Sequence, residues 1–202
     1  MMQMLTRSVE SLITELRSGN PVIIPTDTVY GFAASVAQPE AVDAVYHLKQ
    51  RPAEKALILF GADVEALRPY VAEIPEAVEQ LMAHFWPGAL TVILPKSTAV
   101  PEYVNAGLDT IALRIPQSEL VTRIVAETGV LATTSANRSG EAPLPTVALL
   151  DSTFPDVMIF DEELAGNGMA STIVEWRDSE FLFHRIGAIS KKDIGDVLLR
   201  NY

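Results

Sequence analysis

Cysteine is absent from the 202-residue sequence. Its absence excludes disulfide bonds, a thiolate nucleophile, an iron–sulfur cluster and a zinc site built from thiolates. Histidine is scarce, and the three that occur are far apart without metal-binding spacing, so we interpret each as structural and predict no metal site: His47, His84 and His184. No apolar run reaches the ~18 residues that a membrane span needs, and no secretory signal is recognisable. These absences predict a cytoplasmic protein that does not associate with membranes.

Positive charge is also in short supply. The sequence has 15 Lys and Arg against 26 Asp and Glu, which gives a formal net charge of −11. A broad nucleic-acid surface would need a basic footprint, so we expect no stable nucleic-acid binding, although a local cationic pocket remains compatible with this charge. With 49% apolar and 20% charged residues, the chain is expected to be a compact folded protein. We predict a single domain over residues 1–202.

The familiar nucleotide and hydrolase motifs are missing. There is no G-x-x-x-x-G-K-[ST] loop, and no G-x-G-x-x-G follows the first predicted strand. There is no G-x-S-x-G elbow either, so serine-hydrolase chemistry has no support. Any nucleotide site must therefore be assembled from residues that are scattered along the chain.

Hydrophobic periodicity predicts an α/β protein. Helices are expected over 9–19, from Pro39 onward, and over 63–69, 75–85, 118–128 and 190–199. Strands are expected over 21–25, 56–60, 90–94, 110–115, 130–133, 157–160, 171–175 and 181–184. Several of these strands follow one another without an intervening helix. That order favours a mixed sheet flanked by helices over a strictly doubly wound one.

A polar cluster follows the first predicted strand, at residues 25–31. It brings Thr26, Asp27, Thr28 and Tyr30 together at a strand exit, where side chains can converge on a ligand. A simple turn would account for the proline, aspartate and glycine of this segment. It would not account for both threonines and the tyrosine.

Three cations occur within seven residues at Lys49, Arg51 and Lys55. Guanidinium and ammonium groups are typical ligands of polyphosphate, so this cluster indicates an anionic partner. A solvated helix C-terminus is the alternative, because cations are favoured there. That alternative explains Lys49 better than it explains the other two.

Arg114 interrupts the otherwise apolar strand at 110–115, where an unpaired charge would be costly. It must meet either a carboxylate of the protein or a carboxylate of a ligand, and the sequence leaves both open. Three further polar clusters contribute hydroxyl, amide and guanidinium groups. Thr133, Ser135 and Asn137 come at the end of the strand near 130, Ser171 lies in the pair 171–172, and Arg185 precedes a glycine turn. Together, the clusters describe a site for a pair of ligands that carry phosphate and carboxylate groups.

Seven strings in these clusters occur in the order found in one known family. They are PTDTVYGF, KQRP with a lysine four residues after the arginine, WPGALTVIL, TIALRIP, TSANRSGEAP, STIVEW and HRIGAI. From about Ile23 to Ile189 the sequence resembles the YrdC-type family of L-threonylcarbamoyladenylate synthases, in its short single-domain form. The resemblance implies a YrdC-like fold, in which helices flank a twisted mixed sheet with a concave cationic pocket.

The resemblance also implies an activity. Members of this family join L-threonine, bicarbonate or CO2 and ATP into threonylcarbamoyl-AMP and pyrophosphate, with Mg²⁺ accompanying ATP. Downstream enzymes then transfer the threonylcarbamoyl group to the adenosine beside the anticodon in tRNA. The implied partners of this chain are therefore ATP, L-threonine, bicarbonate and those transfer enzymes.

Matched position by position, the family pattern assigns site residues. The residues that resemble the L-threonine ligands are Thr28, Arg114, Thr133 and Ser171, with Arg114 pairing with the substrate carboxylate. The residues that resemble the ATP ligands are Arg51, Lys55, Thr110, Ser135, Asn137, Pro143 and Arg185. Lys49 and Arg51 match the catalytic cations at the triphosphate. The sequence departs from many members at Ala56 and at Phe60, where a proline and a threonine-contacting histidine often stand, so the resemblance does not extend to that histidine contact.

Other functions remain open from the sequence. An RNA-binding module of the same fold would conflict with the net charge of −11. An inactive paralogue would be expected to lose its phosphate donors first, yet Lys49, Arg51, Ser135 and Asn137 are intact. A carbamoyltransferase domain of a maturation factor shares the fold but normally belongs to a much longer chain.

Overall fold

The computed structural model describes residues 4–50, 55–105, 107–164 and 168–199. Ten strands within these ranges form one sheet, in the spatial order β1-β8-β2-β3-β7-β4-β6-β5-β9-β10. They are β1 (Leu5–Thr6), β2 (Val22–Ile24), β3 (Gly31–Ser35), β4 (Ile58–Phe60), β5 (Leu90–Pro95), β6 (Thr110–Arg114), β7 (Leu131–Ser135), β8 (Met158–Phe160), β9 (Thr172–Arg177) and β10 (Glu180–Arg185). The helices are α1 (Val9–Arg17), α2 (Pro39–Lys49), α3 (Val64–Leu67), the 3-10 helix η1 (Arg68–Tyr70), α4 (Glu76–Phe85), α5 (Glu102–Asn105), α6 (Glu119–Thr128), α7 (Val147–Thr153) and α8 (Lys191–Leu199).

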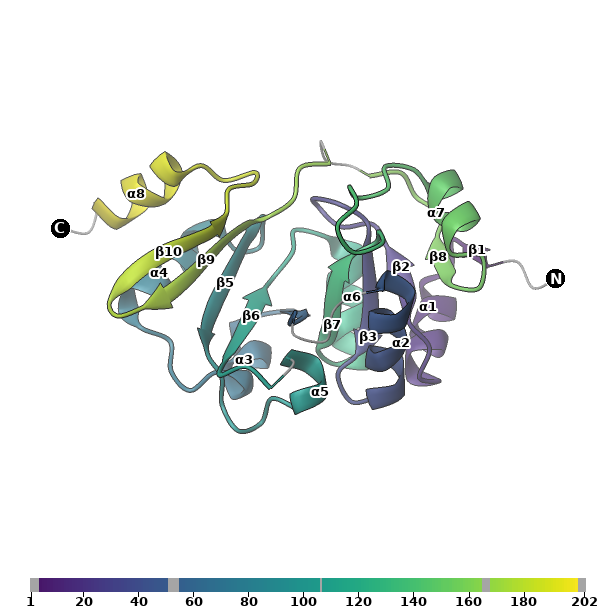
Figure 1. The fold of residues 1–202 in the computed structure, drawn as a ribbon, viewed down its shortest axis with the longest axis horizontal. Coiled ribbons are helices and arrows are strands. Elements are labelled where there is room, and N and C mark those ends of the chain that lie inside the picture. Colours follow the sequence, from purple (N-terminus) through teal and green to yellow (C-terminus); the bar gives the residue numbers. More distant parts are fainter. Residues whose placement is uncertain (1–3, 51–54, 106, 165–167, 200–202) are drawn as a thin grey trace.

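The sheet is mixed, as the order of elements predicts. β8 pairs in parallel with β1 and β2, β4 pairs in parallel with β6, and β5 pairs in parallel with β9. The remaining neighbours are antiparallel. β1 and α8 lie at opposite ends of the long axis of the molecule (Figure 1). The predicted fold class, a mixed α/β sheet flanked by helices, is confirmed.

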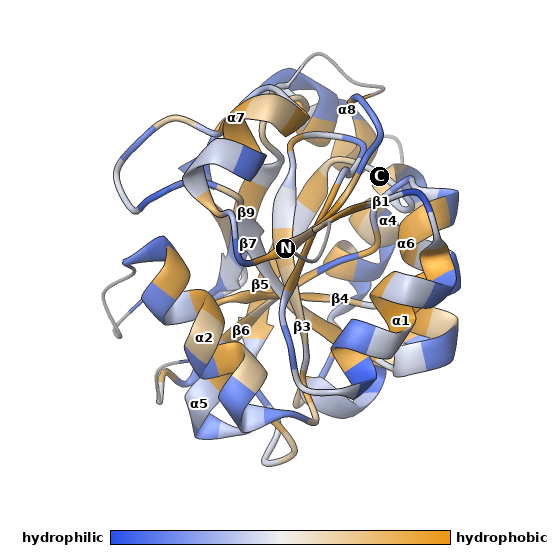
Figure 2. Cartoon of the chain, turned by 90° about the vertical axis from the view of Figure 1, so that its right-hand side faces the viewer, coloured by the Kyte–Doolittle hydropathy of each residue, from blue (hydrophilic) through white to orange (hydrophobic). Residues whose placement is uncertain are grey.

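Helices cover the two faces of the sheet in an unequal way. α1 and α6 pack together on one face, over β2, β3, β7 and β8, and close a core with buried side chains from each of these elements. The opposite face carries a larger core, which includes residues of α2, α4, α7 and α8. The strands and the inward helix faces are orange in Figure 2, and the outward helix faces are blue. Within the described ranges, every helix is too short or too polar to cross a bilayer.

The strand registers show which residues share the face that carries α1 and α6. Paired residues point to the same side of a sheet, and residues two apart on a strand do so as well. Gly31 pairs with Ser135, Ile58 with both Thr133 and Ala112, and Phe60 with Arg114. The same face continues over β5 and β9 through Ile93 and Ile173. Because α1 and α6 pack over the other end of this face, its β4, β6, β5 and β9 end is left for a ligand.

Local sequence signals explain where several helices begin and end. Ser8 caps α1 by accepting a hydrogen bond from the Ser11 amide, and Ser118 caps α6 through the Val121 amide. Pro39 occupies the first turn of α2, where its missing amide proton is not needed. α2 ends at Gln50, whose φ of 51° lies in the left-handed region. The predicted starts of α2, α6 and α8 agree with the structure to within one residue.

Other elements differ from the sequence-based expectation. β3 was not predicted: the polar cluster expected at residues 25–31 reaches only its first residue, and Gly, Ala and Ser have low strand propensity, yet all five of its residues are buried. β1, α5 and α7 were not predicted. The helix expected over 63–69 ends as α3 at Leu67 and continues as the 3-10 helix η1, because Pro69 cannot donate to an α-helical ladder.

Candidate functional site

A cavity of about 650 Å³ lies on the sheet face that α1 and α6 leave open. Its lining brings together nine of the predicted site residues: Thr28, Lys55, Thr110, Arg114, Thr133, Ser135, Pro143, Ser171 and Arg185. Lys49 and Asn137 lie outside this lining, and Arg51 lies outside the described residues. A slightly larger cavity of about 720 Å³ contains none of the predicted residues and is lined by Glu15, His47 and Arg138, among others. The convergence of scattered side chains therefore selects the first cavity as the candidate site.

A tight turn at residues 26–29 forms one wall of the cavity. The Thr26 hydroxyl accepts hydrogen bonds from the amides of Thr28 (3.1 Å) and Val29 (3.2 Å) and donates to the Val29 carbonyl (2.7 Å). Short hydroxyl side chains commonly stabilise turns in this way. The turn lies directly before β3 and fixes the positions of Asp27 and Thr28.

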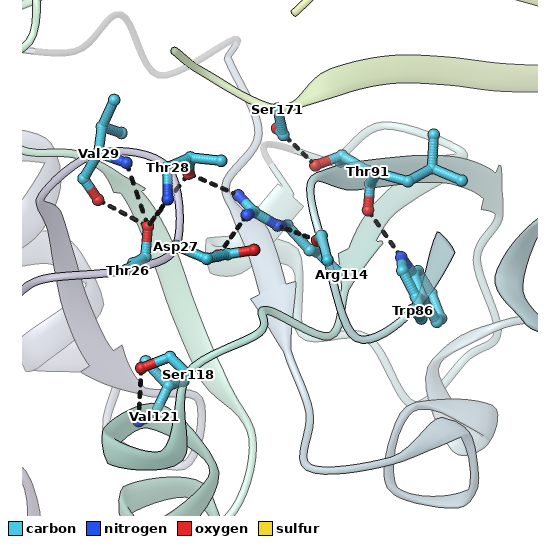
Figure 3. Close-up of polar contacts among 12 residues, drawn as sticks. Thr26, Asp27, Thr28, Val29, Trp86, Thr91, Arg114, Ser118, Val121 and Ser171 are labelled. Atoms are coloured by element: carbon cyan, nitrogen blue, oxygen red, sulfur yellow. Dashed lines mark hydrogen bonds and ion pairs between the residues drawn. The ribbon is translucent and has the colours of Figure 1, made fainter. Parts of the chain in front are cut away.

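Arg114 stands at the end of β6 and is only 3% exposed. Its Nη2 donates to Asp27 Oδ1 at 2.6 Å, its Nη1 to Thr28 Oγ1 at 3.0 Å, and its Nε to the Gly88 carbonyl at 2.9 Å (Figure 3). The sequence left open whether this arginine meets a carboxylate of the protein or of a ligand. The structure shows that a protein carboxylate, Asp27, is one partner, while the side chain still lines the cavity.

Phe60 adds an aromatic partner to Arg114. The guanidinium carbon lies 5.7 Å from the centre of the Phe60 ring, within the range of a cation–π contact. Phe60 lines the cavity and is 5% exposed. The residue that departs from the family pattern therefore contacts the group expected to bind substrate.

A second arginine lines the same cavity from the end of β10. Arg185 donates through Nε to the Ser171 carbonyl at 2.8 Å and through Nη2 to the Ser171 hydroxyl at 3.0 Å. That hydroxyl also shares a 2.9 Å hydrogen bond with Thr91, which is fully buried. A register shift between Phe183 and Arg185 interrupts the β9–β10 ladder at this point. Bulges of this kind re-aim side chains, and both His184 and Arg185 line the cavity here.

The segment after Arg185 is fixed by a close backbone approach. A Cβ on Gly187 would lie 2.0 Å from the Ala170 carbonyl oxygen, so only glycine fits there. The hydroxyl of Thr172, which is fully buried, accepts from the amides of Gly187 (2.8 Å) and Ile189 (3.1 Å) and donates to the Ile189 carbonyl. The HRIGAI string is therefore held against the start of β9.

Lys49 lies behind the cavity wall and is 3% exposed. Its Nζ donates toward the carbonyl (2.6 Å) and hydroxyl (3.2 Å) of Ser135 and toward the carbonyl (3.2 Å) and side-chain oxygen (3.0 Å) of Asn137. The Lys49 carbonyl also accepts from the Ser139 amide at 2.7 Å. The Asn137 side chain in turn donates to the carbonyls of Arg138 and Glu141. Lys49 thus braces the loop that presents Ser135 to the cavity.

Two guanidinium groups line the cavity: Arg114 is buried, and Arg185 is partly desolvated. Burial lowers the pKa of Arg114, the charge of Arg185 lowers it further, and Asp27 opposes both effects. Desolvation also lowers the pKa of Arg185, although that residue is exposed overall. Arginine keeps its proton under all ordinary conditions, so both groups stay charged. Lys55 adds a third cation, and no Asp or Glu is found among the described lining residues.

Some lining residues were not predicted as site residues. The apolar Ile58, Ile93 and Ile173 enter the lining through the strand registers, which a sequence does not reveal. His184 also lines the cavity, and its Nε2 lies 2.5 Å from the buried Glu175 carboxylate. Asp27 was recognised as a member of the 25–31 cluster, but nothing in the sequence paired it with Arg114. Within the described part of the chain, no three His, Asp or Glu side chains lie together so as to hold a metal ion.

Comparisons with known proteins place this architecture. The chain is 38% identical over 190 residues to a protein of Bacillus subtilis named threonylcarbamoyl-AMP synthase, covering 91% of this chain and 54% of that relative. It is 35% identical over 181 residues to a Vibrio campbellii protein of the same name, covering 87% of this chain and 98% of the relative. The solved structure of P. abyssi Sua5 complexed with L-threonine superposes with a TM-score of 0.89 at 33% identity, covering 94% of this chain and 56% of that one.

The chain therefore spans about half the length of the Bacillus subtilis relative and nearly all of the Vibrio campbellii one. The family model for Sua5, YciO and YrdC, described as "Telomere recombination", matches residues 14–187. That match covers most of the chain, including every strand of the cavity wall. The chain belongs to the Sua5/YciO/YrdC family.

Proposed function

We propose that this chain is an L-threonylcarbamoyladenylate synthase, which forms threonylcarbamoyl-AMP and pyrophosphate from L-threonine, bicarbonate or CO2 and ATP. The observation that carries the proposal is the lining of one cavity of about 650 Å³, to which Arg114 and Arg185 both contribute from different strands. That volume suits a nucleotide together with a small amino acid. The names of the Bacillus and Vibrio relatives support the same reaction.

The amino acid is assigned to the Arg114 end of the cavity. An arginine carries five N–H groups, and its bonds to Asp27, Thr28 and Gly88 engage three of them. The other two can meet the carboxylate of L-threonine as a charge-assisted pair. Thr28, Thr133 and Ser171 supply hydroxyls around this end. The P. abyssi relative complexed with L-threonine supports this choice of amino acid.

The nucleotide is assigned to the rest of the lining. Arg185 and Lys55 provide positive charge for the phosphates, and Ser135 provides a hydroxyl at the end of β7. Thr110 and Pro143 also line the cavity, and because Thr110 is half-buried and Pro143 is exposed, a nucleoside can reach them from solvent. Arg51 is proposed as the catalytic cation at the triphosphate, and it lies outside the described residues. Lys49 and Asn137 are proposed to act on the nucleotide through the loop that carries Ser135.

The reaction asks the protein for positioning and charge rather than for covalent chemistry. The free amine of L-threonine attacks CO2, a nitrogen–carbon bond forms, and the amine loses a proton to solvent. An oxygen of the resulting N-carboxylate attacks the α-phosphorus of ATP, and the bond to pyrophosphate breaks. Fixed guanidinium, ammonium and hydroxyl groups stabilise the negative charge that shifts onto the pyrophosphate. ATP is expected to enter as its Mg²⁺ complex, with the ion on phosphate oxygens and water.

The product is a reactive mixed anhydride, so an acceptor must take up its threonylcarbamoyl group. We assign that step to enzymes that transfer the group to the adenosine beside the anticodon in tRNA, and we place the reaction in the cytoplasm. A formal net charge of −11 disfavours the broad basic surface that tRNA binding needs. Transfer is therefore assigned to other proteins.

The test is threonine-dependent pyrophosphate release. Purified protein is incubated with ATP, Mg²⁺, bicarbonate and L-threonine, and both pyrophosphate and the nucleotide product are quantified. The proposal predicts one pyrophosphate per threonylcarbamoyl-AMP and no release when L-threonine or bicarbonate is left out. Pyrophosphate release that is independent of L-threonine, or no release at all from folded protein, would contradict it. RNA binding without turnover would instead favour the RNA-binding alternative.

A further inference from the structure

We propose that Asp27 is a positioning residue for amino-acid binding, which acts by holding the guanidinium of Arg114 in the orientation that receives the substrate carboxylate. The proposal rests on the proposed function and deepens it. Asp27 itself does not line the substrate cavity, so it is not expected to touch substrate. Its effect is exerted through one ion pair.

The contacts of Arg114 fix the plane of the guanidinium. Each of its three nitrogen atoms donates to a different protein oxygen, on Asp27, Thr28 and Gly88. The bond to Asp27 Oδ1 is the shortest of the three, at 2.6 Å, and it is the one that joins opposite charges. A planar fork held at three corners cannot rotate without breaking a bond. The remaining N–H groups therefore keep one direction.

Asp27 is itself held by the turn that Thr26 closes. The Thr26 hydroxyl binds the amides of Thr28 and Val29, so the backbone on the far side of Asp27 is fixed. The carboxylate of Asp27 and the hydroxyl of Thr28 consequently meet two neighbouring nitrogens of one guanidinium (Figure 3). A local turn thereby sets the geometry of a side chain 87 residues away.

The two charges of the pair face different spaces. Arg114 lines the substrate cavity, whereas Asp27 lines a second cavity of about 480 Å³, together with Gln117, Ser118 and Glu119. A substrate carboxylate in the first cavity would thus approach Arg114 from the side away from Asp27. Asp27 can balance the buried guanidinium without occupying the position of the ligand.

The rival explanation is a purely structural ion pair. Removing one partner of a buried pair destabilises a protein whatever its function, so loss of activity alone does not decide. The two explanations differ in which Michaelis constant changes. A positioning role acts on L-threonine and leaves ATP binding unchanged, because the contacts of Arg185 do not include Asp27.

The experiment compares Asp27→Ala and Asp27→Asn with the wild type in the pyrophosphate assay. A hydrogen bond to a charged group is worth about ten- to hundredfold in binding, so Asp27→Ala is expected to raise the KM for L-threonine by that factor. The KM for ATP should change by less than about twofold. Asp27→Asn keeps an oxygen acceptor at the same place, so its KM for L-threonine should lie between the two. Glu119→Ala, which removes a carboxylate of the second cavity that does not contact Arg114, should match the wild type.

Rescue with formate sharpens the test. Because the site of the missing carboxylate opens to the second cavity, added formate should lower the KM for L-threonine of Asp27→Ala and leave that of the wild type unchanged. Any of three results would overturn the positioning role. They are equal increases in both Michaelis constants, an unchanged KM for L-threonine, and a raised KM for L-threonine that formate does not lower. If Asp27→Ala does not fold, the threonine-to-ATP ratio of Asp27→Asn decides in the same way.

Failure of this inference is distinguishable from failure of the proposed function. If the wild type releases pyrophosphate only with L-threonine and the Asp27 variants have an unchanged KM for L-threonine, the role of Asp27 is wrong and the proposed function still holds. Wild-type protein without threonine-dependent release removes the function, and the Asp27 comparison then has no activity to report.

Discussion

The two arginines of the cavity are held in different ways. Arg114 is almost fully buried, pairs with a carboxylate and is bonded through all three of its nitrogens. Arg185 is exposed, and it donates hydrogen bonds to the neutral oxygens of Ser171. Within the described residues, Arg114 has a counter-ion and Arg185 has no salt-bridge partner.

This difference suggests a division of labour within one cavity. A compensated, immobile guanidinium suits a small ligand that must be oriented, such as the carboxylate of an amino acid. An uncompensated guanidinium suits a highly charged ligand, such as a triphosphate, because its charge is not already neutralised. If this division holds, substitutions at the two arginines should change different Michaelis constants.

The largest effect is expected for Arg114→Ala. This change removes the proposed carboxylate ligand and leaves Asp27 buried without its partner, which destabilises a fold by about 3–5 kcal/mol. We expect the KM for L-threonine to rise at least about a hundredfold. Thermal unfolding of the variant, with and without ATP, separates loss of binding from loss of fold. An unchanged threonine KM would contradict the role of Arg114.

Gly187→Ala is expected to have the next largest effect, and it acts on the segment that carries Arg185. The new Cβ would collide with the Ala170 carbonyl, so the segment that follows Arg185 must move. We expect an unfolding free energy lower by about 1–3 kcal/mol and a raised KM for ATP. Gly195→Ala is the matched control, because nothing lies near its Cβ position in α8. There alanine should stabilise the protein by about 0.5–1 kcal/mol.

Arg185→Gln should act mainly on the nucleotide, with a smaller effect on L-threonine through the lost bonds to Ser171. We expect the KM for ATP to rise about tenfold, since a charge-assisted hydrogen bond to phosphate is lost. Its dependence on ionic strength should become weaker, because fewer charges attract the triphosphate. Michaelis constants at low and high salt provide the measurement. An equal rise in the KM for L-threonine would contradict the assignment of Arg185 to the nucleotide.

Phe60→Leu is expected to give the smallest effect. Loss of a cation–π contact is worth about 0.5–1 kcal/mol at most sites, so the KM for L-threonine should rise about two- to fivefold. Leucine keeps most of the apolar volume, and ATP binding should stay unchanged. A threonine KM equal to that of the wild type would show that the Phe60 ring does not support Arg114.

The sequence predicted which residues line the cavity better than it predicted which protein groups those residues contact. Nine predicted residues line one space because polar clusters at strand ends meet in a sheet of this kind. The sequence also indicated that Arg114 needs a partner, since a charge in an apolar strand is costly. It could not identify that partner, because Asp27 lies 87 residues away and only the strand order brings the two together.

Lys49 illustrates the other limit. The sequence offered a solvated helix end or a phosphate ligand for this lysine, and Lys49 does end α2. In the structure its ammonium group is buried against Ser135 and Asn137, more than 80 residues further along the chain. Hydrophobic periodicity fixes which helix carries a residue but gives no information on the loop that approaches it. β3 was missed for a related reason, because its strand character comes from burial between β2 and β7.

The most direct test of the account measures both Michaelis constants in Arg114→Lys and Arg185→Lys, two variants that keep the charge but lose the planar fork. The account predicts a crossed pattern, in which the first variant raises mainly the KM for L-threonine and the second raises mainly the KM for ATP. If each variant changed both constants by the same factor, the cavity would not be divided between an amino acid and a nucleotide, and the account would be wrong.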